Sequence, residues 1–241
     1  MKSGDELPWW DAGLVEYDRA LQLQQEVLQE VLHTGGDGVI LSLQHPPVLT
    51  LGKNAAEKFL LSDSGILESQ GIAVARTDRG GEITAHNPGQ LVIYPILAVA
   101  RLGLGARGLV EILEQACIRL LAEYGLRAST DPANPGVWIS GQKIASVGVR
   151  IKQRISTHGL ALNVSNDLSI FDHIVPCGLV GRQVTSMEKI LKKAPSVDLV
   201  SQQLRQQFAA LLNRPLCLTN GTSPLQIGGG DRMISYQSRD R

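Results

Sequence analysis

Apolar residues recur at helical spacing in three stretches of the chain. The first covers residues 11–32, where Asp11 can cap the N-terminus and two glycines follow the end. The second covers residues 110–124. The third covers residues 196–211, where Ser196 stands at the start. We therefore predict three amphipathic helices that each bury one face.

Other stretches have the composition and alternation of β-strands. Residues 39–52 alternate like a strand and are interrupted by Pro46-Pro47, which cannot sit inside a central strand. Residues 72–77, 90–97 and 156–164 are further strand candidates. Strands and helices therefore share one chain that shows no internal repeat.

Residues 136–152 are predicted to form a hairpin, because two β-rich runs meet at Ser140-Gly141. Antiparallel strands with helices at both ends indicate an α+β domain with a central mixed sheet. We expect a single domain over residues 1–218. The polar, glycine-rich residues 219–241 lack any period and are predicted to be a flexible tail.

Composition and charge exclude several classes of protein. The chain has 241 residues, 43% of them apolar, and its 23 basic and 23 acidic side chains give a net charge of zero. A nucleic-acid partner is disfavoured, because such proteins usually carry a basic excess. There is no apolar run long enough for a membrane span, and residues 1–13 carry acids and a proline where a signal peptide needs apolar residues. We expect a soluble, cytoplasmic protein with neither a nucleic-acid nor a membrane partner.

Three cysteines, Cys117, Cys177 and Cys217, stand at wide spacings without a CxxC pair. This excludes a disulfide scaffold or a zinc ribbon. Cys117 lies on a helical apolar stripe and Cys217 in a short apolar segment, so both are predicted to be packing residues. Cys177, in VPCGLVG (175–181), has turn-forming flanks instead. It could be inert, a metal ligand, half of a disulfide or a nucleophile.

A nucleophilic Cys177 needs a neighbour that favours its thiolate. Lys143, in GQKIAS just after the predicted hairpin turn, is one candidate, although spacing alone favours a lysine at the surface. His86, His158 and His173 offer the alternative of a Cys/His pair. Taken singly, each histidine fits a hydrogen-bonded structural role better.

Two further motifs are weaker signals. RGGEITAHNPGQ (79–90) is glycine-rich but fits neither GxGxxG nor a Walker loop, so it is a weak signal for a nucleotide site. Its glycines and proline indicate either a backbone bent tightly around a bound group or a simple bend between strands. Arg150, Lys152 and Arg154 alternate and are predicted to share one strand face. A solvated outer face is the favoured interpretation, and a docking stripe for an acidic partner is the alternative.

Taken together, five motifs in order resemble one family, the lipoyl(octanoyl) transferases of lipoate biosynthesis. The resemblance covers roughly residues 12–212. The motifs are LQHPPVLTLG (43–52), RGGEITAHNPGQLVIYPIL (79–97), GVWISGQKIASVGVRI (136–151), THGLALNV (157–164) and FDHIVPCGLVG (171–181).

The resemblance implies the architecture shared with biotin and lipoate protein ligases, a central mixed, mainly antiparallel sheet flanked by helices. It implies transfer of an octanoyl group from octanoyl-acyl carrier protein to a lysine of a lipoyl domain. The acceptors would be the lipoyl domains of 2-oxoacid dehydrogenase E2 subunits and the glycine cleavage H protein. Cys177 stands where the family has its acyl-carrying cysteine, and Lys143 where it has its paired lysine. No metal or cofactor is implied, because the thioester arrives activated.

The resemblance also implies an acyl pocket and its composition. The family usually has an aromatic residue and a glycine where this chain has Ala85 and Asn87, a change expected to reshape the pocket wall. The small residues Gly148 and Gly159 are expected to leave a slot for the acyl chain. Backbone N–H groups near Gly178 or around Gly80-Gly81 are expected to stabilise the oxyanion. The implied pocket residues are Arg79, Gly80, Gly81, Glu82, Ile83, Thr84, Ala85, His86, Ser146, Val147, Gly148, Gly159, Leu160 and Ala161.

Three alternatives remain open at this stage. An ATP-dependent lipoate or biotin protein ligase of the same architecture would activate a free acid and would not need Cys177. An amidotransferase would move octanoyl between lipoyl domains by the same chemistry. A catalytically inactive module could bind carrier proteins, although the presence of both Cys177 and Lys143 argues against it.

Overall fold

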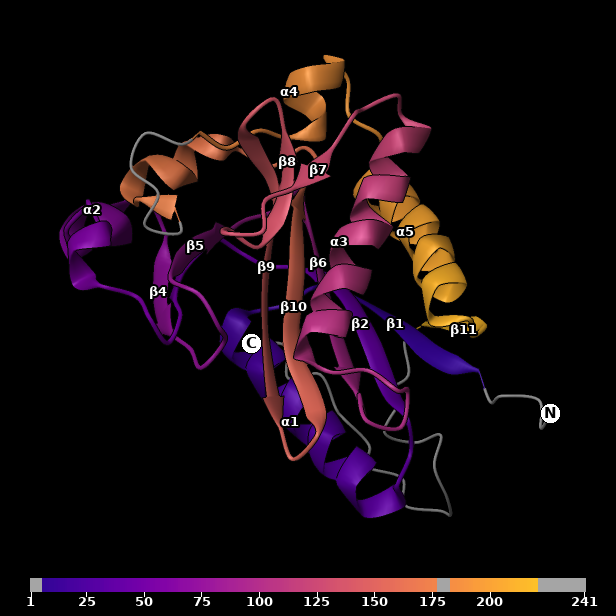
Figure 1. The fold of residues 1–241 in the computed structure, drawn as a ribbon. Helices are drawn as coiled ribbons and strands as arrows, with labels where there is room; N and C mark the ends of the chain where they lie inside the picture. The colour runs from indigo at the N-terminus through magenta and orange to yellow at the C-terminus, as the bar shows by residue number, and fades with distance from the viewer. Residues whose placement is uncertain (1–5, 177–182, 221–241) are drawn as a thin grey trace.

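The structure is a computed structural model that describes residues 6–176 and 183–220 (Figure 1). Its main element is an eight-stranded sheet in the order β11-β1-β2-β6-β10-β9-β8-β7. The strands β11, β1 and β2 run parallel to one another, and every pairing from β2 to β7 is antiparallel. The strands are β1 (Leu7–Leu14), β2 (Gly38–Gln44), β6 (Gln90–Leu97), β7 (Ser129–Thr130), β8 (Gly136–Ile139), β9 (Gln142–Lys152), β10 (Ile155–Asn163) and β11 (Leu216–Asn220).

A second, three-stranded sheet has the order β4-β3-β5. It consists of β3 (Val48–Leu51), β4 (Ala73–Arg76) and β5 (Ile83–His86). The helices are α1 (Tyr17–Thr34), α2 (Ser64–Ser69), α3 (Ala106–Glu123), α4 (Met187–Leu191) and α5 (Val197–Leu212), with 3-10 turns η1 (Glu57–Phe59) and η2 (Leu168–His173).

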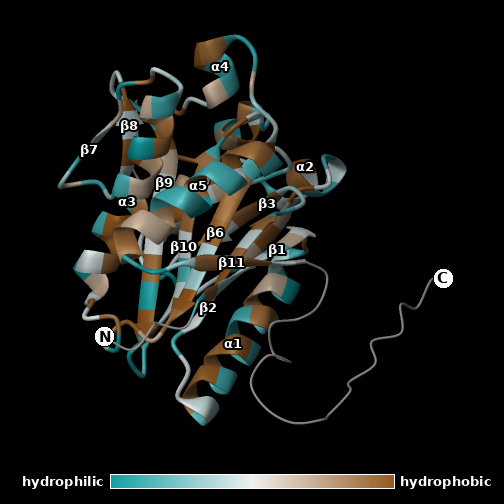
Figure 2. Cartoon of the chain, turned by 90° about the vertical axis from the view of Figure 1, so that its right-hand side faces the viewer, coloured by the Kyte–Doolittle hydropathy of each residue, from teal (hydrophilic) through white to brown (hydrophobic). Residues whose placement is uncertain are grey.

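Helices cover both faces of the large sheet. On one face α1 buries its apolar side against β2, β6 and β10, and on the other α3 and α5 pack over β6, β8, β9 and β10. Figure 2 shows hydrophobic residues along the strands beneath α5 and hydrophilic ones on its outward side. The predicted central mixed, mainly antiparallel sheet flanked by helices is confirmed.

The predicted start of the first helix is wrong, whereas the other helix predictions hold. Asp11 lies in β1, where its carboxylate accepts only a local hydrogen bond from the N–H of Gly13. The strand forms because β1 alternates at its start, burying Leu7 and Trp9. Helix α1 begins at Tyr17 without a side-chain cap, and Gly35 ends it in the left-handed conformation.

The double proline separates two strands that belong to different sheets. Strand β2 ends at Gln44, and β3 begins at Val48 and pairs with β4 and β5. The strand β5 was missed, because the glycines and the proline on either side of it indicated a bend. The predicted strand 72–77 is observed as β4, and the predicted strand 90–97 as β6.

The predicted hairpin is confirmed, with both turn residues at positive φ, 49° at Ser140 and 78° at Gly141. At the C-terminal end, Thr219 pairs with Trp10 and belongs to strand β11, which ends at Asn220. The rest of the predicted tail, 221–241, lies outside the described residues.

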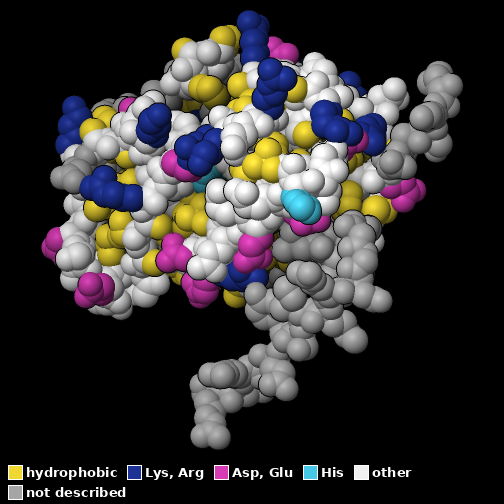
Figure 3. Space-filling view, turned by 90° about the horizontal axis from the view of Figure 1, so that it is seen from below, with side chains coloured by type: hydrophobic (Ala, Val, Ile, Leu, Met, Phe, Trp, Pro, Cys, Tyr) yellow, Lys and Arg dark blue, Asp and Glu magenta, His cyan; other side chains and the backbone are white. Residues whose placement is uncertain are grey.

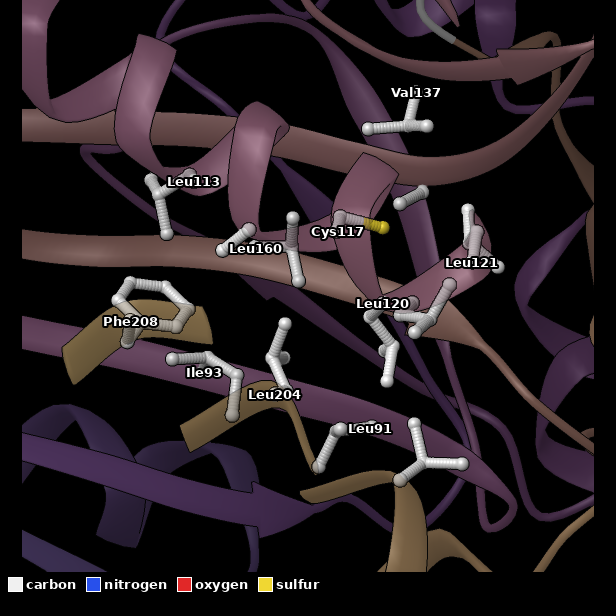
Figure 4. Packing of buried hydrophobic residues seen from close by; sticks show 14 of the residues in the cluster. Leu91, Ile93, Leu113, Cys117, Leu120, Leu121, Val137, Leu160, Leu204 and Phe208 are labelled. Atoms are coloured by element: carbon white, nitrogen blue, oxygen red, sulfur yellow. The ribbon is translucent and has the colours of Figure 1, made fainter. Parts of the chain in front are cut away.

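Cys117 is a packing residue, as predicted. It is fully buried on α3 among leucine and isoleucine side chains of the main core, where Figure 4 shows its sulfur between Leu120, Leu121 and Val137. Burial raises the pKa of its thiol far above the usual range. Cys117 is therefore neutral and chemically inert in the folded chain.

Candidate active site

A cavity of about 450 Å³ is bounded by the segment 79–82, strand β5, and strands β9 and β10 of the large sheet. Its lining follows β9 from Lys143 to Val149, which is ~20 Å of extended strand. This cavity brings together most of the residues implied as an acyl pocket. Those that line it are Arg79, Gly80, Gly81, Glu82, Thr84, His86, Ser146, Val147, Gly148, Gly159, Leu160 and Ala161.

Ile83 and Ala85 do not have the pocket position implied for them. Their side chains are buried in a separate cluster between the small sheet and η2. The reason is the period of two in β5, which sends Thr84 and His86 toward the cavity and the two apolar side chains to the other face. The expectation that Ala85 reshapes the cavity wall is therefore wrong, because its methyl group does not line the cavity and is buried in the apolar cluster on the other face of β5.

The two glycines expected to leave a slot are instead required by close backbone neighbours. A Cβ at Gly159 would lie 2.1 Å from the carbonyl oxygen of Ile93, and one at Gly148 would lie 3.0 Å from that of Gly80. The first glycine lets β10 pass a carbonyl of β6, and the second lets the segment 79–81 cross β9. The space that a side chain would occupy at each of these glycines is therefore taken by neighbouring main chain.

The N–H of Gly80 is also engaged, since it donates to the carbonyl of Val149 at 3.3 Å. It is therefore unsuitable as the oxyanion donor suggested by the sequence. Gly178, the other suggested donor region, lies outside the described residues.

Lys143 is buried, with only 5% of its surface exposed, so the interpretation as a surface lysine is wrong. Its Nζ donates to the carbonyl of Pro135 at 3.1 Å and lies 4.9 Å from the centre of the Trp138 ring. Strand register places it there, because Trp138 is directly opposite Lys143 in the β8–β9 hairpin. The ammonium thus stands at the cavity wall, held by a carbonyl and an aromatic face.

Cys177 lies outside the described residues, but both ends of its segment are anchored. Before it, the N–H of Val175 donates to the carbonyl of Phe59 at 2.8 Å. After it, the carbonyl of Gln183 accepts from the backbone N–H of Lys143 at 3.0 Å, and the N–H of Thr185 donates to the carbonyl of Lys143 at 2.9 Å. The chain that follows Cys177 therefore pairs directly with the lysine implied as its partner.

The histidines of the cavity form a neutral cluster. His158 donates from Nε2 to a carboxylate oxygen of Asp78 at 2.9 Å, and His86 donates from Nδ1 to the amide oxygen of Gln90 at 2.7 Å. Burial lowers the pKa of His158 to about 3 and that of His86 well below its usual range. Both rings are therefore uncharged at neutral pH.

His158 is also far from Lys143 along the sheet. It pairs across the strands with Val149, six positions from Lys143 on β9, or ~20 Å of extended chain. His173 bonds to Ser62 at 2.7 Å and to Gln70 at 3.0 Å, which fits a structural role. The geometry thus favours Lys143 over His158 as the group beside Cys177.

The predicted basic stripe does not form a single strand face. Strand β9 ends at Lys152, and Arg154 lies in the tight turn before β10 with a φ of 63°. Arg150 is paired with Asp78 and is half-buried. In Figure 3 basic side chains are scattered among acidic and apolar ones on the face drawn.

Several lining residues were not assigned to the site from the sequence. Tyr17 comes from α1, Tyr94 from β6 and Val110 from α3, and the sequence indicated only that each lies within a predicted helix or strand. Of these three residues, only Tyr94 could have been identified from the sequence. A tyrosine in an otherwise apolar strand indicates a polar group nearby, because a buried hydroxyl needs a hydrogen-bond partner. That partner is His45, whose Nε2 lies 2.8 Å from the Tyr94 hydroxyl.

Over residues 6–176 and 183–220, no three histidine, cysteine or acidic side chains are grouped so that they could hold a metal ion. Across the same two ranges, no helix has both the length and the apolar character needed to cross a membrane.

The sequence is similar to one known family over most of its length. The lipoyl protein ligase A/B catalytic domain matches residues 16–209. An octanoyltransferase of Alkaliphilus metalliredigens is 40% identical over 202 residues, covering 83% of this chain and 93% of the relative. The mitochondrial octanoyltransferase LIP2 of Arabidopsis thaliana is 39% identical over 206 residues, covering 85% and 88%.

Solved structures share the fold at low sequence identity. Lipoate-protein ligase A bound with ATP superposes with a TM-score of 0.73 at 15% identity, covering 92% of each chain. A bipartite lipoate protein ligase from Thermoplasma acidophilum gives a TM-score of 0.66 at 17% identity, covering 93% of this chain and 90% of the other. The chain therefore belongs to the lipoyl protein ligase A/B catalytic-domain family, among its octanoyltransferase members.

Proposed function

We propose that this chain transfers an octanoyl group from octanoyl-acyl carrier protein to a lysine of a lipoyl domain, through an acyl-thioester on Cys177 with Lys143 as proton carrier. One observation carries the proposal. The buried ammonium of Lys143 stands at the wall of the cavity, and its own backbone pairs with the residues that follow Cys177. The similarity to octanoyltransferases supports the choice of octanoyl as the acyl group and of acyl transfer as the reaction.

In the first half-reaction, the Cys177 thiolate attacks the thioester carbonyl of the donor. A new carbon–sulfur bond forms, the bond to the carrier's thiol breaks, and the departing thiolate takes a proton from the Lys143 ammonium. One thioester replaces another, so this exchange changes the free energy little. The positive charge of Lys143 favours the attacking thiolate before the proton is handed over.

In the second half-reaction, the amine of the acceptor lysine attacks the Cys177 thioester. A carbon–nitrogen bond forms, the carbon–sulfur bond breaks, and the neutral Lys143 amine accepts the proton that the incoming amine loses. The Cys177 thiolate and the Lys143 ammonium are restored together. The amide is more stable than the thioester, which drives the sequence forward.

The cavity supplies the binding energy for the acyl chain. Val147, Leu160 and Ala161 contribute apolar surface along β9 and β10. Each methylene buried there contributes ~0.8 kcal/mol, so an eight-carbon chain gains several kcal/mol over a short acyl group. Such a gain is large enough to select the length of the donor.

The partners follow from this reaction. The donor is an acyl carrier protein, and the acceptors are lipoyl domains, for which we propose those of 2-oxoacid dehydrogenase E2 subunits and the glycine cleavage H protein. An ATP-dependent ligase shares the fold, but it would activate a free acid and leave Cys177 unmodified. The alternatives therefore differ in donor and in the fate of Cys177.

Intact-mass measurement after mixing the full chain with octanoyl-acyl carrier protein tests the proposal. We expect one octanoyl adduct, located on Cys177 by peptide mapping, that disappears when a lipoyl domain is added. Cys177→Ala is expected to form no adduct. Modification of a lipoyl domain from free octanoate and ATP, without an adduct on Cys177, would instead establish the ligase reaction.

A further inference from the structure

Glu114 is a charged side chain in an apolar place. In the part of the chain that the structure describes, it is the only acidic residue among the buried side chains, with 8% of its surface exposed. It lies on the inner face of α3, beside Leu113 and three positions before Cys117 in the main core. A carboxylate in such surroundings needs a hydrogen-bond donor. Its Oε1 accepts from the backbone N–H of Gly136 at 2.8 Å.

The same peptide group also holds Lys143. The N–H of Gly136 and the carbonyl of Pro135 belong to one planar peptide unit. Its nitrogen donates to Glu114 at 2.8 Å, and its oxygen accepts from Nζ of Lys143 at 3.1 Å. In a trans peptide the N–H and C=O point in opposite directions, so carboxylate and ammonium stand on opposite sides of it. A carboxylate, a peptide and an ammonium thus form one chain of hydrogen bonds.

We infer that Glu114 is a positioning residue for Lys143 and acts through the Pro135–Gly136 peptide. The inference rests on the proposed function, because it assigns Glu114 to the lysine that carries the proton. Hydrogen bonds in a chain polarise one another, so a carboxylate on the N–H side strengthens the carbonyl as an acceptor for the ammonium. Glu114 thereby helps to orient the Lys143 ammonium and to stabilise its positive charge.

The geometry around Gly136 supports this assignment. Its φ of +136° is open to glycine, and a Cβ there would lie 2.5 Å from the carbonyl oxygen of Ala145 and 3.2 Å from Cε of Lys143. The peptide can approach the lysine this closely only because no side chain intervenes. On another side the Trp138 ring lies 4.9 Å from Nζ, so the ammonium is fixed from more than one direction.

The charges near Glu114 come from two elements. Burial raises the pKa of Glu114 and the nearby Glu111 of the same helix adds to the rise, whereas the N–H of Gly136 and the charge of Lys143 on β9 lower it. A role in packing alone would need an acceptor for Gly136 but no charge. Glutamine keeps the acceptor and removes the charge, so Glu114→Gln separates the two roles.

The experiment measures single-turnover acylation of Cys177 by octanoyl-acyl carrier protein, using rapid quench and intact mass, over a range of donor concentrations. We expect Glu114→Gln to lower the rate at saturating donor about tenfold, because a hydrogen bond to a charged group is replaced by a neutral one. The half-saturating donor concentration should stay within about twofold, since Glu114 does not touch the donor. Glu111→Gln, which removes the same charge from the exposed side of α3, is expected to match the unmodified chain.

Glu114→Asp separates charge from fold. It keeps the charge at a shorter reach, so its rate should fall between that of Glu114→Gln and that of the unmodified chain. Rates that follow the melting temperature of the variants, rather than their charge, would overturn the inference. So would equal rates for Glu114→Gln and Glu111→Gln while Lys143→Ala is crippled, and the proposed function would then stand. Full activity of Lys143→Ala would instead overturn the proposed function itself.

Discussion

The two ends of strand β9 carry the same kind of side chain in opposite surroundings. At one end Lys143 is 5% exposed and bonded to a carbonyl and an aromatic face. At the other end Arg150 is paired with Asp78 at the surface, and Lys152 is exposed. The cavity lies along the strand from Lys143 to Val149. A cation on this strand is thus buried or solvated according to the groups that surround it.

The buried end is held largely by main-chain groups, in addition to the Trp138 ring. The carbonyl of Pro135 and the backbone of Gln183 both bond to Lys143. The exposed end is held by a carboxylate that water can replace. We therefore expect substitutions at the first end to change the reaction and substitutions at the second to change little.

Lys143→Ala is expected to give the largest effect. Removing a positioned proton carrier typically lowers a rate about 10²- to 10⁴-fold, and we expect this loss in single-turnover acylation of Cys177 and in transfer to the lipoyl domain. Circular dichroism should show the fold intact. Lys152→Ala is the matched control and should act at the normal rate. A Lys143→Ala variant that keeps more than about a tenth of the activity would break the comparison.

Gly136→Ala should disturb the buried end through the backbone. Alanine at a φ of +136°, with its Cβ 2.5 Å from the carbonyl oxygen of Ala145, is expected to lower the free energy of unfolding by about 3 kcal/mol. Gly141→Ala is the control, because its φ is also positive at 78° but a Cβ there meets nothing within 4 Å. It should cost only about 1 kcal/mol in urea unfolding. Equal losses for the two variants would show that the close approach at Gly136 does not matter.

Buried histidines make the stability of the fold depend on pH. Burial lowers the pKa of His45 to about 4 and that of His158 to about 3, from an ordinary 6.5. Between the lowered and the ordinary pKa values, the rings are protonated in the unfolded chain but not in the folded chain. The free energy of unfolding is therefore highest above pH 6.5 and falls as the pH drops below it. Burial also lowers the pKa of His86 well below its ordinary value, so from pH 6 to pH 5 the three rings together should remove about 3 to 4 kcal/mol from the free energy of unfolding.

Urea unfolding at pH 7, 6 and 5 measures this slope. His158→Asn is expected to reduce it by about a third, since asparagine tolerates the positive φ of this position and does not titrate. A slope that His158→Asn does not alter would mean that the proton uptake lies elsewhere.

Arg150→Ala is expected to give the smallest effect. Its ion pair with Asp78 is partly exposed on both sides, with 35% and 49% of the side chains accessible, so its loss should cost about 0.2 to 1 kcal/mol. Raising the salt concentration should reduce this difference. Acylation of Cys177 should stay near normal. A loss above about 2 kcal/mol would show that the surface end is also a structural centre.

The periodic parts of the fold could be predicted from the sequence. The stripes of α3 and α5 and the turn at Ser140-Gly141 carry their signals within a few residues. The helix start at Asp11 was predicted wrongly, because an aspartate can cap a helix but also occurs within a strand. Only the alternation of Leu7 and Trp9 could have indicated β1.

The site was predictable in composition but not in geometry. The motifs supplied most of the lining residues, and a period of two through 83–86 could have excluded Ile83 and Ala85 in advance. The burial of Lys143 could not be predicted, because what buries it is a carbonyl from one turn and a tryptophan across a hairpin. Glu114 had no signal at all, since its partner is a backbone N–H 22 positions away.

The parallel pairing of β11 with β1 has a consequence for synthesis on the ribosome. Strand β1 pairs with β11, which lies far from it along the chain, and Trp9 on β1 packs against Phe208 of α5, with ring centres 5.7 Å apart. Until the final helix and strand have left the exit tunnel, β1 has an open edge and an uncovered indole. In the nascent polypeptide this strand edge and this indole therefore stay uncovered until α5 and β11 have been translated and can pack.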